Sequence, residues 1–255
     1  QPFEERIGYS YERYVRDLSQ SRNEKRYEED KAYWMERIPN FPEYPHVPLA
    51  QKVSDCTEYT IVRKQDVICK KTWAKFKEVA KAHRISPSSL LCTIYAKVLA
   101  RWSNQQDLVL NLTAFERKPF HKDVEKIIGD FTKLLPLALS MNENDLWKQA
   151  SDVQTRIMDG LEHLSFDGTE IMRELAKSKG QFGKAILPVV FTCVLFDAPE
   201  NYFEVLGKLN YAISQTPQIF IDNQISEMGK KLYVTWDVVK ELFDPEIIDK
   251  IFHDF

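Results

Sequence analysis

The segment that most limits how this chain can fold is an almost wholly apolar helix placed just before a buried strand. Ser86-Pro87 predicts the start of that helix, because serine caps a first turn and proline fits the first helical position. Residues 87–102 are apolar on most faces, so the helix is expected to be buried. Residues 108–112 then form a short apolar run typical of an interior strand. A buried helix joined to a buried strand at this spacing favours an α/β layer.

The remaining predicted elements extend this layer. Apolar periodicity predicts helices at 9–38, 72–83, 144–164, 168–178 and 245–252, and strands at 57–62, 134–139, 187–195, 209–214, 219–226 and 232–236. The charged stretch 21–31 is left open as a break or a solvated part of the first helix. Four prolines exclude regular helix or central strand from 39–48, which we expect to be extended.

Short polar residues indicate where some of these elements begin. Asn142 or Asn144 is expected to cap the long helix that follows, and Asp237 is expected to cap a short helix after the last strand. Segment 227–231, with its glycine, is expected to form a hairpin turn.

Composition limits the class of protein. The chain has 255 residues, 44% of them hydrophobic and 29% charged, which predicts one large globular domain or two small ones. A net charge of −3 offers no overall electrostatic signature for nucleic acid or a membrane surface, and we expect neither as a partner. No apolar run approaches the roughly 20 residues that cross a bilayer. No secretory signal is visible at the start, so we expect a cytoplasmic location.

Other signatures narrow the chemistry. The four scattered cysteines are predicted to be buried thiols in a reducing compartment. Gln1 is not an initiator, so we expect a fragment or a processed product. The sequence has no Walker A loop, GxGxxG, GxSxG, HExxH or CxxC. We therefore expect no metal and no bound nucleotide.

One apolar strand contains a polar interruption. Asp222, Asn223 and Gln224 continue the extended run that starts at Ile219, although Asp and Asn are poor strand formers. A local inconsistency of this kind is typical of functional sites. The alternative is a solvated edge strand that leads into the hairpin.

Seven stretches of the chain resemble, in order and spacing, one known family. They are Tyr33-Trp34 to Arg37 with Pro42, Pro45 and Pro48-Leu49; 86–103; Asn111-Leu-Thr113 with Arg117-Lys-Pro119, His121 and Asp123; Gly129-Asp-Phe-Thr132; Pro188-Val-Val-Phe-Thr192, where Cys193 replaces the usual serine; Ser214-Gln-Thr-Pro-Gln218 with Asp222 and Gln224; and Trp236-Asp237 with Leu242-Phe243. Together they resemble the heterocyclization domains of nonribosomal peptide synthetases, a variant of the condensation-domain family.

The resemblance implies a fold. It is the α/β, chloramphenicol-acetyltransferase-like sandwich, and the match is to the C-terminal lobe of a two-lobed condensation-type domain. Residues 1–50 would then be a helical, proline-rich lead-in from the N-terminal lobe or linker, and 51–255 the C-terminal lobe. The family's paired aspartates, DxxxxD, belong to the N-terminal lobe. Asp244 and Asp249 fit that spacing, but they lie on a terminal helix and are interpreted as a helix cap and a surface residue.

The resemblance also implies a reaction and its residues. A carrier-bound acyl thioester condenses with carrier-bound Cys, Ser or Thr, and the product is cyclodehydrated to a thiazoline or oxazoline. Asp222 and Thr192 occupy the positions of the cyclodehydration dyad. Candidate substrate-binding residues are Gln215, Gln218, Asn111 and Thr113, whereas Asp130 is interpreted as a structural acceptor and His121 as a loop cap.

The partners and alternatives follow from the same resemblance. The phosphopantetheine arms of upstream and downstream peptidyl carrier domains would present the substrates, and the N-terminal lobe and an adenylation domain would lie next to this chain. An ordinary amide-forming condensation domain and a non-catalytic docking scaffold stay open, although retention of Asp222 and Thr192 argues against the scaffold. A paired-aspartate or paired-histidine motif upstream would discriminate cyclization from simple amide formation. The ring type, the acyl donor and the product, a siderophore or an antibiotic, stay open.

Overall fold

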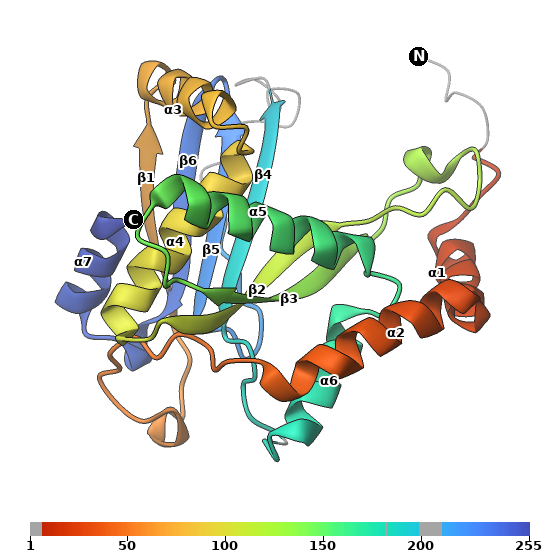
Figure 1. The fold of residues 1–255 in the computed structure, drawn as a ribbon, viewed down its shortest axis with the longest axis horizontal. Coiled ribbons are helices and arrows are strands. Elements are labelled where there is room, and N and C mark those ends of the chain that lie inside the picture. The colour runs from red at the N-terminus through yellow and green to blue at the C-terminus, as the bar shows by residue number, and fades with distance from the viewer. Residues whose placement is uncertain (1–6, 182, 199–210) are drawn as a thin grey trace.

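One mixed sheet organises the protein. The computed structural model describes residues 7–181, 183–198 and 211–255. Six strands pair in the order β1-β6-β5-β4-β2-β3 (Figure 1). Their bounds are β1 Ile61–Ile68, β2 Asp107–Phe115, β3 Thr132–Ser140, β4 Val189–Ala198, β5 Ile221–Met228 and β6 Lys231–Val239. The expected α/β architecture is confirmed.

The middle of the sheet is parallel and its outer pairs are antiparallel. β4 pairs in parallel with both β2 and β5, whereas β1, β6 and β3 run antiparallel to their neighbours. β5 lies between β4 and β6, which excludes the alternative of a solvated edge strand. β5 and β6 are joined by the expected hairpin, in which Gly229 and Lys230 both adopt positive φ, at 55° and 62°. Two such residues are characteristic of a two-residue type I′ turn.

Helices lie around this sheet. They are α1 Tyr11–Gln20, α2 Lys25–Arg37, α3 Lys70–Ala82, α4 Pro87–Ser103, α5 Leu146–Glu162, α6 Gly168–Ser178 and α7 Pro245–Asp254. In Figure 1, α4 and α5 lie across the near face of the strands. As the sequence predicts, α4 is buried, and Ser86 Oγ accepts a hydrogen bond from Ser89 N at 3.0 Å. Tyr95 of α4 packs against the rings of Phe191 and Trp236 from the sheet.

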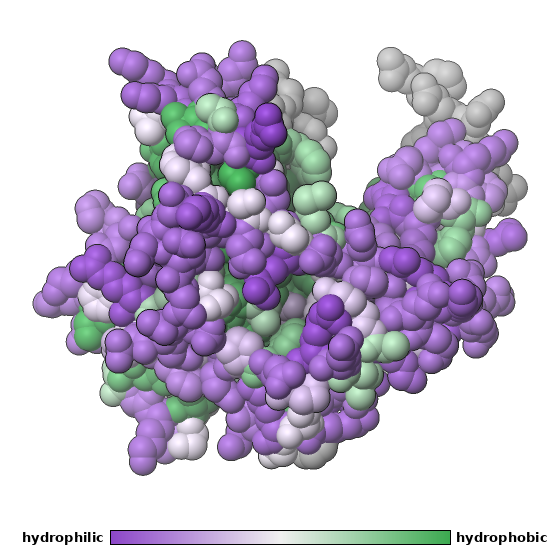
Figure 2. All heavy atoms as spheres, in the orientation of Figure 1, coloured by the Kyte–Doolittle hydropathy of each residue, from purple (hydrophilic) through white to green (hydrophobic). Residues whose placement is uncertain are grey.

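The N-terminal helices form an arm beside this body. α1 packs on residues 116–131 in a second small core that includes Tyr14 and Phe131. A Cβ at Gly129 would lie 2.0 Å from the Tyr11 ring, so glycine is required for this close approach. Figure 2 shows an open gap between the upper part of this arm and the main body.

The first fifty residues also contribute to the main core. Trp34, Ile38, Phe41 and Val47 are buried there together with side chains from the sheet. Residues 41–50 have neither helix nor strand, in line with the proline content of this segment, and backbone bonds hold them, such as Val109 N to Glu43 O at 3.0 Å. The division at residues 50 and 51 stays a prediction.

Several predicted boundaries are wrong, for local reasons. The first strand begins at Ile61 instead of residue 57, because Thr60 is bonded to the turn after β6, with its N–H on Glu241 and its carbonyl on Lys240. The open choice at 21–31 resolves into a short 3-10 break at Ser21–Asn23. Asp145, rather than Asn142 or Asn144, caps α5 by accepting from two backbone N–H groups.

Two errors concern the site described below. The expected strand at 209–214 lies partly outside the described residues, and residues 211–214 have no regular structure. Asp237 caps no helix: it lies within β6, with its carboxylate on Arg63. Its partner Arg63 is far away in sequence, so the local pattern, an aspartate near a turn of the chain, led to the wrong prediction of a helix cap.

Candidate functional site

A groove of about 700 Å³ lies on the face of the sheet opposite α4, between the parallel strands, α6 and residues 214–219. Strands place successive side chains on opposite faces, so every second residue of β2, β4 and β5 points to this groove. On β5 these are Asp222 and Gln224, and the intervening Asn223 bonds to Trp236 Nε1 on the helix side at 2.8 Å. The polar interruption in this strand therefore places two polar side chains in the groove and one in the core.

The strand register brings the predicted residues into two rows. Asn111, Val190 and Asp222 are partners across β2, β4 and β5, and Thr113, Thr192 and Gln224 form the next row. Asp222 and Thr192 thus lie on neighbouring strands and on one face, offset by two residues. A strand spacing of about 4.8 Å and a two-residue rise of about 6.6 Å put their Cα atoms roughly 8 Å apart.

Each member of the predicted dyad has its own partner. Thr192 Oγ1 donates to Thr113 Oγ1 at 2.8 Å. Asp222 is 8% exposed, and its Oδ2 accepts from Gln224 Nε2 at 2.9 Å. The partner of this buried carboxylate is an uncharged amide, so Asp222 can exchange a proton without first breaking an ion pair. Direct cooperation between Asp222 and Thr192 stays a prediction.

Asn111 carries an unsatisfied acceptor in the same groove. The residue is 2% exposed, and its Oδ1 has no hydrogen-bond partner within the part of the chain that the structure describes. A buried polar atom of this kind costs free energy unless a ligand supplies the missing bond. Asn111 can therefore accept an N–H from a bound amide.

A buried ion pair stands directly beside Asp222. Asp237, which is 2% exposed, faces Asp222 across β5 and β6, and Arg63 faces Asp237 across β1 and β6. Arg63 donates from Nε and Nη2 to the two Asp237 oxygens, at 2.8 and 2.6 Å. These hydrogen bonds to Asp237 raise the pKa of the Arg63 guanidinium. The sequence prediction missed this pair, although an aspartate inside the apolar run of β6 was a signal of it.

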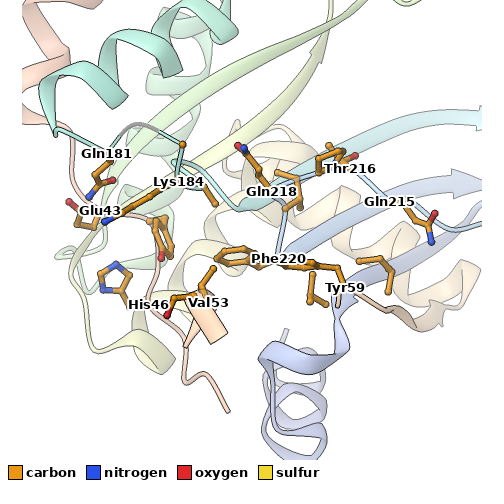
Figure 3. A pocket seen from close by; sticks show the side chains of 18 residues that line it. Glu43, His46, Val53, Tyr59, Gln181, Lys184, Gln215, Thr216, Gln218 and Phe220 are labelled. Atoms are coloured by element: carbon orange, nitrogen blue, oxygen red, sulfur yellow. The ribbon is translucent and has the colours of Figure 1, made fainter. Parts of the chain in front are cut away.

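The two predicted glutamines occupy different positions. Gln218 and Thr216 line both the groove and a second cavity of about 1030 Å³ on the other side of residues 214–219 (Figure 3). Gln215 lines only the second cavity. Gln218 has φ 65°, a left-handed backbone that is uncommon outside glycine and typical of functional loops.

The other polar residues singled out from the sequence have structural contacts. Asp130 Oδ1 accepts from Thr132 N at 2.9 Å, and the hydrogen bonds from Thr132 lower the pKa of Asp130. His121 Nδ1 accepts from Asp123 N at 3.1 Å, as a loop cap does. Asp244 caps α7, and Asp249 pairs with Lys64.

Within 7–181, 183–198 and 211–255, no three His, Cys, Asp or Glu side chains are grouped to hold a metal ion. In the same ranges no helix combines the length and apolar character that spanning a membrane requires.

Comparison with known proteins gives consistent matches over nearly the whole chain. A family model described as "Condensation domain" matches residues 1–255. Bacitracin synthase 1 from Bacillus licheniformis is 36% identical over 254 residues, which is 98% of this chain and 5% of that protein. Phenyloxazoline synthase MbtB from Mycobacterium sp. (strain MCS) is 32% identical over 233 residues, covering 88% of this chain and 20% of the relative.

A solved structure agrees in fold. The EpoB NRPS cyclization-docking bidomain from Sorangium cellulosum superposes with a TM-score of 0.86 at 26% identity, over 96% of this chain and 50% of that chain. The chain thus spans half or less of the length of each of these proteins.

Proposed function

Since this chain belongs to the condensation-domain family, we propose that it is the C-terminal lobe of a heterocyclization domain in a nonribosomal peptide synthetase. It would join a carrier-bound acyl thioester to carrier-bound Cys, Ser or Thr and close the product to a thiazoline or oxazoline. One relative is named as a phenyloxazoline synthase and one solved neighbour as a cyclization bidomain, which supports ring formation. Cytoplasmic localisation remains part of this proposal.

The observation that carries the proposal is the strand register. Asp222 and Thr192 are 30 positions apart in the sequence, yet they reach one groove on neighbouring parallel strands. Asn111 and Thr113 enter the same groove from β2. A carboxylate, two hydroxyls and an open amide acceptor are the groups that closure of an amide into a ring would use.

The first stage needs little from these side chains. The substrate amine attacks the thioester carbonyl, the new C–N bond forms, and the C–S bond to the carrier breaks with transfer of the amine proton to the leaving thiolate. A thioester is already a good electrophile, so this stage relies mainly on holding both carrier arms in line. The phosphopantetheine arms enter as parts of the substrates.

The second stage is harder, because an amide is a poor electrophile. The thiol or hydroxyl attacks the amide carbon, a C–S or C–O bond closes the ring, and the former carbonyl oxygen leaves as water. Its two protons come from the attacking group and from the amide nitrogen. Asp222 would take the proton of the attacking group and return it to the departing oxygen. Thr192 would turn its hydroxyl hydrogen from Thr113 to that oxygen as negative charge develops on it, and Thr113 would then donate to Thr192.

The remaining predicted residues would hold the substrate. Asn111 Oδ1 has the vacant acceptor position that a substrate amide N–H can fill. Gln218, at the wall between the two cavities, would orient one carrier-bound chain, and Gln215 would contact it only from the second cavity.

The direct test is reconstitution of the complete module with loaded carrier proteins. Mass spectrometry of the carrier-bound product distinguishes the ring from the open amide, because the ring is lighter by one water. We expect the ring. A product that stops at the amide would identify an ordinary condensation domain, and no product would identify a docking scaffold. The 255-residue chain alone is expected to make neither product, because the family resemblance implies a substrate tunnel formed between two lobes, and this chain resembles only one of them.

A further inference from the structure

Asp222 does not stand alone on β5: a continuous line of polar contacts extends from it to the far edge of the sheet. Gln224 Nε2 donates to Asp222 Oδ2 at 2.9 Å and lies 3.5 Å from Asp237 Oδ2. Arg63 in turn donates hydrogen bonds to both carboxylate oxygens of Asp237. One amide group with two hydrogens therefore bridges two carboxylates, and its orientation is set by both.

Charge explains why this arrangement needs all four residues. Asp222 and Asp237 are direct partners on neighbouring antiparallel strands, where Cβ atoms are about 4.5–5.5 Å apart and like charges repel. Arg63 compensates the charge of Asp237 by a two-point contact. Of these two carboxylates, Asp222 is the one that has no ion pair with a described residue, and it lies in the groove, where a proton has to be exchanged.

The same carboxylate also holds the loop beside the groove. Ser214 N donates to Asp237 Oδ2 at 2.6 Å. Residues 214–218 continue from this anchor to Gln218, whose left-handed backbone forms part of the wall between the two cavities. Asp237 therefore connects the loop and the strand at a single buried point.

From these contacts we infer that Asp237, held by Arg63, is a positioning residue for ring closure that acts through Gln224 on Asp222 and through Ser214 on the substrate loop. The inference rests on the proposed function. Asp237 itself is 2% exposed and is not among the residues that line the groove, so its part is to orient other groups.

The test uses the ratio of ring to open amide made by the complete module with loaded carriers. Asp237→Asn keeps the shape and removes the charge, and Gln224→Leu removes only the bridging amide. Misplacement of a reacting group by about 1 Å can cost about 100-fold. We expect each variant to lower the ratio roughly 10- to 100-fold while amide formation continues.

A matched control separates positioning from folding. Lys77 of α3 pairs with Glu227, a carboxylate of β5 that is 5% exposed and faces the helices. Arg63→Met removes the cation that pairs with Asp237, and Lys77→Met removes a cation that pairs with Glu227. Only the first of these carboxylates lies beside Asp222. We expect Lys77→Met to leave the ratio of ring to amide unchanged.

Each outcome decides between the possibilities. If the wild-type module makes no ring, the proposed function fails before the variants are compared. If the wild type makes the ring but Asp237→Asn and Gln224→Leu lower amide and ring in equal proportion, or match Lys77→Met, the residues are structural only and the inference is overturned. Should Arg63→Met not fold, Gln224→Leu still decides, because it leaves the ion pair intact.

Discussion

Replacing Asp222 by Asn should stop ring closure while leaving the fold almost unchanged. Asn has the same shape and can still accept from Gln224, whose amide now lies 2.9 Å from Asp222 Oδ2, but it cannot take a proton. Because Asp222 has an amide for a partner, its replacement by a neutral group breaks no ion pair. We expect the free energy of unfolding to change by about 1 kcal/mol or less, the scale of one hydrogen bond.

The expected kinetic loss follows from the chemistry of the second stage. A positioned acid or base typically accelerates a proton transfer by about 10²–10⁴-fold, which corresponds to about 3–5 kcal/mol of barrier. Amide formation depends mainly on the proximity of the two substrates, so its rate should fall less than about tenfold. The assay follows open amide and ring separately over time by mass spectrometry of the carrier-bound product in the complete module.

Glu227→Gln provides the matched control, because it makes the same chemical change on the same strand. Glu227 is buried, faces the helices and pairs at 2.6 Å with Lys77, whose side chain is partly exposed, so neutralisation of Glu227 removes this ion pair. We expect it to lower stability by about 1–3 kcal/mol in urea unfolding and to leave the ratio of ring to amide unchanged. Ring formation by Asp222→Asn at a rate near that of the wild type would refute the assignment of Asp222 as the proton carrier.

Three further predictions concern single residues. Thr192→Val keeps the shape and removes the hydroxyl that donates to Thr113, so the ring should form about 10-fold more slowly with amide formation retained, and an equal loss of both products would contradict this. Gly129→Ala places a methyl group against the Tyr11 ring, which should lower the free energy of unfolding by about 1–3 kcal/mol and speed proteolysis within residues 116–131. Unchanged resistance to proteolysis would show that the arm adjusts without strain. A hydrogen bond from Thr72, at 3.3 Å, lowers the pKa of the exposed Cys69 thiol, whereas burial raises the pKa of the Cys92 thiol. Because the thiolate is the reactive form, iodoacetamide should label Cys69 first at neutral pH, and Thr72→Val should slow the labelling of Cys69. Equal labelling of the two cysteines would refute the argument.

Local chemistry in the sequence determined much of the fold. The cap at Ser86 and the apolar faces that follow it predicted α4 almost to its ends, because these signals act within one turn of the chain. The glycine hairpin between β5 and β6 is local for the same reason. Alternation along β5 places Asp222 and Gln224 on one face, since a strand repeats every two residues.

The rest depended on pairing between distant segments, which no local pattern determines. The side-chain register that sets Thr192 beside Gln224 rather than Asp222 exists only once β4 and β5 are aligned. Asp237 seemed to be a helix cap because an aspartate before a turn usually is one, yet its partner Arg63 lies 174 positions away. Burial decided the outcome: the Asp237 carboxylate is 2% exposed and is compensated by the Arg63 cation, which the strand order β1-β6-β5 brings next to Asp222. The sequence thus determined which polar groups are present, and the tertiary structure decided which of them meet.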